Sequence, residues 1–467
     1  MKYFLLFVAT LIFSLPCPAQ IYHPDYVATI VFHGIDSAGP TETGVFGFDE
    51  KNDMVDDMCN LMDKDPGYLH PRVKDQITMA RYYGDTFPDY YTQADKDDVN
   101  SVTAEFGGGI PRYAMIMAKF CKHVTDRSGA LQINVAGVSM GALVGRWMIE
   151  NDYENLASSG KIARFITIEG ALCGNWAATN SESIADLIED AYDMNSIDIQ
   201  HLNYSWVEDN LHNPRKEMGE AVYGNMIVCH WASTDDDMYE NALTTASQEP
   251  NDGICLYEDA FFHSYALTAL YREHAPTLSH VHATHLSVKQ HEGIRAGLAA
   301  DITSTRRVRI TLLDATVLNL PEYEVFGEGE MVFGCAVYSP EVFEQYGITD
   351  SINKIGHHGR TVSPVELKED ESVTVNQELF NDFILPGETS LRLEFDLREI
   401  DYDTVYQIVE NPMDKNQEID SGAIEVPVNG NGVYPMKTDD WEGNIKVDII
   451  DYPDFIVPAT GCSWGAY

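Results

Sequence analysis

The chain has few basic residues and, after its first twenty positions, no long apolar run. Its 467 residues include 30 Lys and Arg against 74 Asp and Glu, a formal net charge of −44. A surface this acidic repels nucleic-acid phosphates and anionic lipid headgroups, so we expect no nucleic-acid partner. No later segment is apolar for long enough to cross a bilayer, so we expect no integral membrane segment. The acidity indicates solubility or, alternatively, calcium bound at carboxylate clusters.

The sequence also lacks internal repeats, low-complexity tracts and the cysteine spacing of a zinc site. Of the eight cysteines, seven follow residue 20. An odd number predicts a free thiol or an intermolecular bridge. Two intramolecular pairs remain open, Cys229 with Cys255 and Cys335 with Cys462.

The first twenty residues are typical of a cleavable secretory signal. Lys2 precedes an apolar run over residues 3–15, and small residues precede Gln20. Pro16 argues against a lipid anchor on Cys17. We predict cleavage near Ala19 or Gln20 and therefore a secreted or periplasmic protein.

The length and the 44% content of hydrophobic residues predict a globular protein of two or three domains. Up to about residue 300, short apolar runs alternate with helical spacing. Strands are expected at 27–32, 76–83, 131–138, 164–168 and 226–231, and helices at 51–63, 111–124, 141–150 and 287–300. This alternation predicts a mostly parallel sheet covered by helices on both faces, over residues 21–303.

Two stretches depart from this order. Residues 181–225 are longer than an ordinary connection, and their helical spacing indicates a surface insertion or a lid over a site. After Thr303 apolar residues alternate with polar ones, as in Val308, Ile310 and Leu312, which predicts an antiparallel β-sandwich over residues 304–467. We expect a fold boundary here, not a continued sheet, so a fragment ending at Thr303 should fold by itself.

The motif Gly-x-Ser-x-Gly occurs at residues 137–141, where a predicted strand meets a predicted helix. Such a turn exposes the serine at the start of a helix, and its small neighbours permit close approach. We therefore predict that Ser139 is a nucleophile and that the Met140 N–H stabilises an oxyanion. His33 and Gly34 follow the first strong strand, and a turn there would direct the Ile35 N–H to the same position.

A serine nucleophile of this type requires an acid and then a histidine later in the chain. Asp252, in an Asp-Gly turn, is the preferred acid, and Asp237 in an acidic cluster is the alternative. His285, before the last predicted helix, is the preferred base. His280 and His282 are the alternatives.

These segments together resemble the α/β-hydrolase superfamily, and within it the bacterial triacylglycerol lipase-like branch. The resemblance covers roughly residues 26–300 and is carried by VFHGID at 31–36, VAGVSMGALVGRWMIE at 135–150, PNDGI at 250–254 and THL at 284–286. It implies a triad of Ser139, Asp252 and His285 with oxyanion donors at Ile35 and Met140. The sequence departs from the branch at Val138, at residues 169–172 and at Ser287, where related lipases carry a calcium-binding aspartate.

We therefore expect a secreted serine esterase or lipase that acts on a small-molecule or lipid ester without a cofactor. An amidase or an acyltransferase has the same triad. The alternative of another class is a binding or adhesion protein on a hydrolase scaffold. By analogy, the C-terminal sandwich is expected to bind lipid, glycan or protein.

Overall fold

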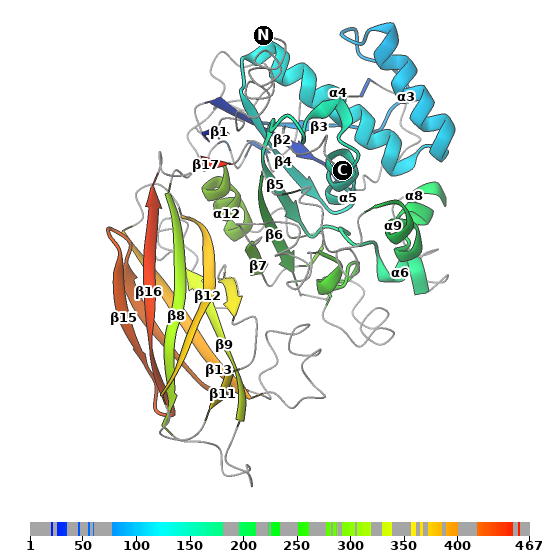
Figure 1. The fold of residues 1–467 in the computed structure, drawn as a ribbon. Coiled ribbons are helices and arrows are strands. Elements are labelled where there is room, and N and C mark those ends of the chain that lie inside the picture. The colour runs from blue at the N-terminus through cyan, green and yellow to red at the C-terminus, as the bar shows by residue number, and fades with distance from the viewer. Residues whose placement is uncertain are drawn as a thin grey trace, which may run out of the picture.

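The structure is a computed structural model, and Figure 1 shows its helices and strands. It describes residues 20–21, 26–34, 45–46, 55–56, 59, 77–180, 196–211, 223, 226–233, 251–260, 277–281, 284–285, 287, 292–303, 306–318, 329–338, 356–360, 365–367, 372–384, 389–399, 418–451 and 456–457. Within this part of the chain, no helix combines the length and the apolar character needed to cross a membrane.

A parallel sheet forms the centre of the N-terminal part. Its strands, in spatial order, are β3 (Ile77–Ala80), β2 (Val27–Phe32), β4 (Gln132–Val138), β5 (Ile162–Ile168), β6 (Ile227–Ser233) and β7 (Thr277–Val281). Each neighbouring pair is parallel. Every residue of β2 and β5 is buried, as expected for strands covered on both faces. The five expected strands are confirmed, and β7 is one that we did not predict.

Helices cover this sheet on both sides (Figure 1). They include α4 (Gly109–Ser128) and α5 (Met140–Glu150) on one side, and α12 (Glu292–Thr303) toward the accessory part. Helix α3 (Gln93–Phe106) packs on α4. The Trp231 indole of β6 donates to Asp301 of α12 at 3.2 Å, which holds that helix on the sheet. We did not predict α3, because it buries only Val99 and so has no apolar stripe.

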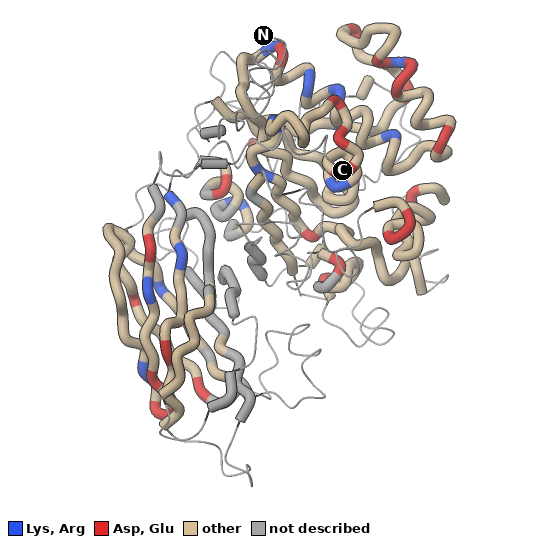
Figure 2. Tube along the Cα trace, viewed as in Figure 1, with Lys and Arg blue, Asp and Glu red and all other residues tan. Residues whose placement is uncertain are grey.

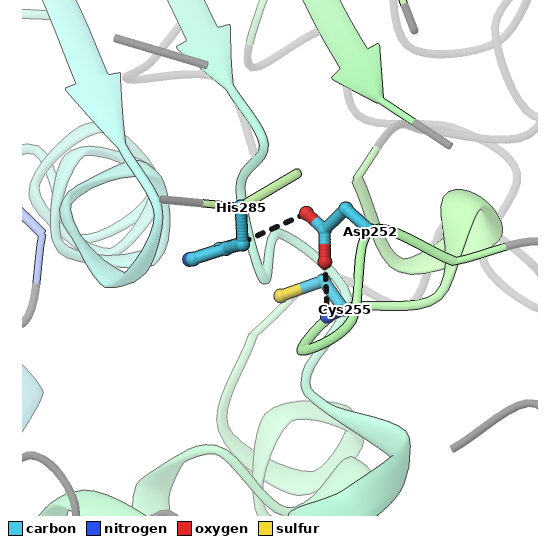
Figure 3. A group of neighbouring side chains, drawn as sticks. All are labelled: Asp252, Cys255 and His285. Carbon is cyan, nitrogen blue, oxygen red and sulfur yellow. Dashed lines mark hydrogen bonds and ion pairs between the residues drawn. The ribbon is translucent and has the colours of Figure 1, made fainter. Parts of the chain in front are cut away.

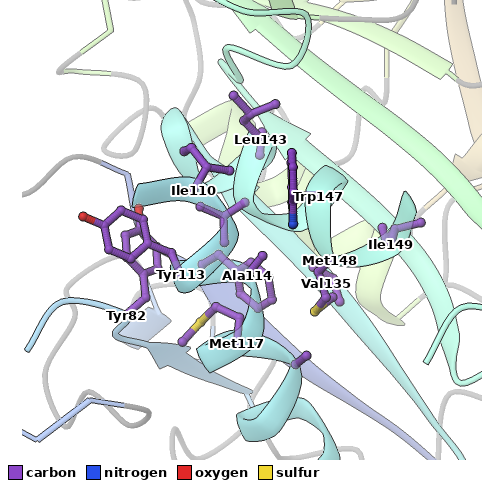
Figure 4. Close-up of a cluster of buried hydrophobic side chains, with 14 of the residues drawn as sticks. Tyr82, Ile110, Tyr113, Ala114, Met117, Val135, Leu143, Trp147, Met148 and Ile149 are labelled. Carbon is purple, nitrogen blue, oxygen red and sulfur yellow. The ribbon is translucent and has the colours of Figure 1, made fainter. Parts of the chain in front are cut away.

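The main core lies between the parallel sheet and helices α4 and α5 (Figure 4). Ile110 and Met117 of α4 and Leu143 and Trp147 of α5 are all buried in this core. Both helices have buried residues along most of their length, so the helical spacing of their apolar residues could be recognised in the sequence.

Part of the expected insertion at 181–225 is described, and it is helical. It contains α8 (Ser196–His201) and α9 (Tyr204–Asn210), and α6 (Trp176–Asn180) directly precedes it. The helical spacing between residues 184 and 191 lies outside the described residues. Of the helix expected at 51–63, only residues 55, 56 and 59 are described, and they are helical.

The C-terminal part is antiparallel, as its period-two pattern predicts. One sheet has the order β12 (Ser372–Ile384), β8 (Arg306–Val317), β16 (Trp441–Asp451) and β15 (Gly432–Lys437). The facing sheet contains β14 (Glu418–Pro427), β13 (Ser390–Glu399) and β9 (Gly329–Tyr338), with β11 (Val365–Leu367) paired to β9. Val308 and Ile310 from one sheet pack with Leu393 and Phe395 from the other in a separate core. The fold class is therefore an α/β hydrolase followed by a β-rich accessory part.

The expectation that the parallel sheet ends at this boundary is wrong. Strand β10 (Gly356–Arg360) pairs with β7 on one side and with β9 on the other, both antiparallel. The sheet therefore continues from the hydrolase part into one layer of the sandwich, and 11 of its strands lie in the described residues. Alternation of apolar and polar residues indicates which face of a strand is buried, but it does not indicate which strand lies beside it. The pairing of β10 with β7 could therefore not be predicted from the sequence.

The described ends of the chain also pair. Strand β1 (Gln20–Ile21) lies antiparallel to β17 (Ile456–Val457). Charged residues of both signs occur mainly on helices and on the sandwich strands, and the central parallel strands carry few (Figure 2). Cys229 and Cys255 are not joined in a disulfide. Cys462 lies outside the described residues.

Candidate active site

Ser139 occupies a strained turn between β4 and α5. Its φ of 52° and ψ of −126° lie where a residue with a side chain pays a steric cost. Two glycines make the turn possible. A Cβ on Gly137 would stand 2.6 Å from Ala142 Cα, and one on Gly141 would stand 2.6 Å from Phe32 O. The predicted strand-to-helix elbow is therefore present, and both of its glycines are required by close backbone approach.

The structure brings Ser139 together with the two preferred partners. His285 Nε2 lies 2.8 Å from Ser139 Oγ, and His285 Nδ1 lies 2.7 Å from Asp252 Oδ2. All three are nearly inaccessible to water, with Ser139 exposed to 7% and the side chains of His285 and Asp252 to 8% and 3%. Figure 3 shows Asp252 and His285 directed toward each other from separate loops. Their catalytic roles remain predictions.

The loop at 251–260 presents the Asp252 carboxylate rigidly. Oδ1 accepts from the backbone N–H groups of Ile254 at 2.9 Å and Cys255 at 2.7 Å, which leaves Oδ2 for His285. The backbone of His285 is tied to the same turn, because its N–H donates to Asp252 O at 3.0 Å. The buried side chain of Asn175 also holds the loop, because it donates to Ile254 O at 2.9 Å. The Asp-Gly turn therefore positions both the acid and the base.

The structure gives no side-chain contacts for the alternative acid and the alternative bases. Asp237 and His282 lie outside the described residues. His280 is a residue of β7, in register with Gly356 of β10.

The segment proposed for the oxyanion site is described as far as Gly34, and Ile35 lies outside the described residues. Gly34 packs directly on the serine, because a Cβ there would stand 2.8 Å from Ser139 Cβ. His33 has a structural role: its ring stacks on Tyr82 at 3.9 Å, and its Nε2 accepts from the Tyr82 N–H at 3.3 Å. The Tyr82 hydroxyl donates to His33 O at 2.7 Å and holds the backbone of this segment. Met140, the other expected donor, is the first residue of α5.

Sequence reasoning missed one acidic residue beside the triad. Glu169 follows β5 directly, is 1% exposed, and its Oε2 lies 3.6 Å from His285 Nδ1. Ser233, the last residue of β6, donates to its Oε1. Burial, and then the negative charge of Asp252, raise the pKa of the Glu169 carboxyl well above its usual value. Its position at the carboxyl end of a predicted strand, next to the serine strand, was the signal that could have identified it.

The described part of the insertion is anchored beside α4. His201 Nδ1 accepts from the Ile110 N–H at 3.2 Å, and Tyr113 donates to Asp198 at 3.2 Å. Burial raises the pKa of Asp198 to about 7 and lowers the pKa of His201 to about 4. The insertion is thus held by polar groups that are neutral near pH 6.

Two groups of described residues could hold a cation. In the first, Asp95, Asp98 and Glu154 converge on Lys119 Nζ, so an ammonium group already neutralises these carboxylates. In the second, Cys255 lies beside the Asp252–His285 pair, where those two side chains already bind each other. Neither arrangement is an open carboxylate cage of the kind calcium prefers. The expected independence from cofactors remains a prediction.

Comparison with known proteins finds no matching protein family and no matching curated protein. Several solved structures are similar in fold. A lipase of Bacillus licheniformis, BlEst2 in mature form, is 13% identical with a TM-score of 0.34, and the match covers 59% of this chain and 89% of the lipase. The metagenomic carboxyl esterase MGS0156 is 14% identical with a TM-score of 0.34, over 59% of this chain and 68% of the esterase.

Another solved structure, a single domain of plant extended synaptotagmin 1, is 9% identical with a TM-score of 0.21, over 32% of this chain and 97% of that domain. Likenesses this weak are no basis for a shared activity. The assignment of the fold therefore depends on the strand order and the serine turn of the chain itself.

Proposed function

We propose that this chain is a serine hydrolase that cleaves carboxylic esters. The observation that supports this best is the continuous hydrogen-bonded series Ser139 Oγ, His285 and Asp252, with distances of 2.8 and 2.7 Å, at a strained strand-to-helix turn. A buried, strained arrangement of this kind carries a conformational cost, which favours a catalytic role over a purely structural one.

In the proposed reaction His285 Nε2 takes the proton of Ser139 as Oγ attacks the ester carbonyl carbon. The carbonyl oxygen becomes an oxyanion held by the N–H groups of Ile35 and Met140, the latter at the positive end of α5. His285 then gives its proton to the leaving alcohol, and an acyl-enzyme forms. Water, activated by the same histidine, releases the acid and restores Ser139.

Asp252 makes this sequence possible by fixing the histidine. With Nδ1–H bound to Asp252 Oδ2, the lone pair of Nε2 faces Ser139. The carboxylate also stabilises the imidazolium that forms in each half of the reaction. Because the site is nearly dry, this interaction is less screened than it would be in water.

A preference for esters over amides is tested by comparing the two kinds of substrate directly. Turnover of p-nitrophenyl esters of increasing acyl length, run beside the matching anilides, separates an esterase or lipase from an amidase. Transfer to an added alcohol identifies an acyltransferase. A chain that neither turns over these substrates nor reacts with a fluorophosphonate is a binding protein on a hydrolase scaffold.

We further propose that the protein is secreted or periplasmic, after cleavage of the predicted signal. Cleavage after Ala19 leaves both residues of β1 available to pair with β17, whereas cleavage after Gln20 removes one of them. N-terminal sequencing of the exported protein distinguishes the two sites. The accessory sandwich is proposed to bind lipid, glycan or protein.

A further inference from the structure

Glu169 combines a strained backbone with a completely buried acidic side chain. Its φ is 48°, in the left-handed region that glycine adopts easily and other residues rarely do. The backbone is held there by its N–H, which donates to Trp231 O at 2.7 Å. The side chain is 1% exposed. The chain thus keeps a carboxyl group where both the backbone conformation and the lack of water oppose it.

The two carboxyl oxygens of Glu169 differ in their surroundings. Oε1 accepts from Ser233 Oγ. Oε2 has no hydrogen-bond partner among the described residues and lies 3.6 Å from His285 Nδ1. A buried polar oxygen without a partner is rare in folded proteins and is costly unless it has a use. Nδ1 of His285 therefore faces two carboxyl groups, Asp252 at 2.7 Å and Glu169 at the longer distance.

Two carboxyl groups that face one imidazole in a dry site do not both ionise readily. Asp252 accepts hydrogen bonds from two backbone N–H groups as well as from the imidazole. Glu169 accepts only from Ser233, and the pKa of its carboxyl is raised by burial and by Asp252. Both influences favour the protonated form of the Glu169 carboxyl.

We propose that Glu169 is a reserve positioning acid, which makes no hydrogen bond to His285 while Asp252 orients it and takes over the Nδ1–H hydrogen bond when the charge of Asp252 is removed. The inference rests on the proposed function, because it concerns the same histidine. Glu169 touches neither substrate nor Ser139 in this role. It acts only through the tautomer and orientation of the imidazole.

The substitution Asp252→Asn separates the two acids. A carboxamide at this position can donate to Nδ1, which leaves the proton on Nε2, where it prevents His285 from accepting the Ser139 proton. Burial continues to raise the pKa of the Glu169 carboxyl in this variant, but the contribution of the Asp252 charge is removed, so Glu169 loses its proton at a lower pH than in the wild type. Once ionised, Glu169 can accept from Nδ1–H and restore the productive tautomer.

The first test is a double-mutant cycle on Asp252→Asn and Glu169→Gln, with kcat/KM measured across the pH range in which the wild type stays folded. Glu169→Gln alone is expected to lower kcat/KM less than Asp252→Asn does. Asp252→Asn keeps a residual rate that rises with pH. The double variant is slower than Asp252→Asn by about 10-fold or more and loses that rise. Thermal unfolding of each variant shows whether the strained turn stays folded.

A second variant tests the same idea without touching either acid. The Ser233 hydroxyl favours the ionised form of Glu169, so Ser233→Ala should raise the pKa of that carboxyl. In the Asp252→Asn background, Ser233→Ala is therefore expected to move the rise in residual rate to higher pH. A rise that stays at the same pH would contradict an origin in Glu169.

The decisive readout does not depend on catalysis. A hydrogen-bonded Nδ1–H of His285 gives a strongly downfield proton resonance, which is followed by NMR in the full-length chain. Asp252→Asn should keep this resonance at high pH, and the double variant should lose it. Equal spectra and equal rates for the two would overturn the proposal. If the wild type hydrolyses no ester, the proposed function fails, and the spectra still decide the role of Glu169.

Discussion

A methyl group added at Gly34 should disrupt the active site, although Gly34 itself has no side chain that takes part in the reaction. A Cβ at this residue would lie 2.8 Å from Ser139 Cβ, 3.2 Å from Val138 O and 3.4 Å from Ser139 Oγ. Carbon atoms in contact are normally about 3.5–4 Å apart, so the two segments must separate by about 1 Å. Tyr82 holds the other side of Gly34, which limits how the segment can yield.

The size of the effect follows from this displacement. Overpacking of this kind costs roughly 1–3 kcal/mol of folding stability, so most of the protein stays folded. A misplacement of about 1 Å at a catalytic site costs roughly 10²-fold in rate. We expect Gly34→Ala to lower kcat for a p-nitrophenyl ester by about that factor, with a smaller change in KM, because the displaced Ile35 N–H serves the oxyanion rather than the bound ester.

A matched glycine controls for the substitution itself. The Cβ of Gly430→Ala would have no heavy atom within 4 Å, so this variant should keep the wild-type turnover and thermal stability. Both variants are measured by steady-state ester hydrolysis and by thermal unfolding. If Gly34→Ala keeps the wild-type kcat and unfolds as the wild type does, the close contact between this segment and Ser139 does not set the geometry of the site.

The remaining predictions concern the triad, the accessory part and the insertion. His285→Ala should lower ester turnover on the order of 10³-fold, and a loss below about 10-fold would remove it as the base. A fragment ending at Thr303 leaves the edge of β7 unpaired and should aggregate or lose turnover, whereas a soluble, active fragment would show that the continued sheet is dispensable. Asp198 has a pKa raised from 3.8 to about 7, so its contribution to stability falls as pH rises through that window. Asp198→Asn should therefore gain stability over the wild type, on the order of a few kcal/mol above about pH 7 and little near pH 4, in unfolding measured at both values.

The sequence predicted the elements whose burial leaves a pattern. Strand β2 occurs over the predicted residues 27–32, and the serine turn lies where its two glycines indicated. Both features could be predicted because they depend only on residues that are close in sequence: the spacing of apolar residues in the strand, and the glycines that allow close backbone approach in the turn. The Asp-Gly turn placed Asp252 for the same reason, because the turn orients its own carboxylate.

What the sequence could not predict depends on contacts between distant residues. The pairing of β10 with β7 joins residues far apart in the chain, for example Gly356 with His280, and no local signal specifies that edge. Glu169 looked like one more acidic residue among 74 until β5 and β6 brought it to His285. The capped helix α3 was missed because its outward face is polar and only Val99 is buried.

Reaction with a fluorophosphonate shows whether Ser139 is an activated nucleophile. We predict that the wild type is labelled at Ser139 and loses ester hydrolysis in proportion to labelling. Ser139→Ala should be neither labelled nor active, with a loss of about 10³-fold or more and an unchanged unfolding temperature. A folded Ser139→Ala protein that still hydrolyses the ester at most of the wild-type rate would show that Ser139 is not the nucleophile.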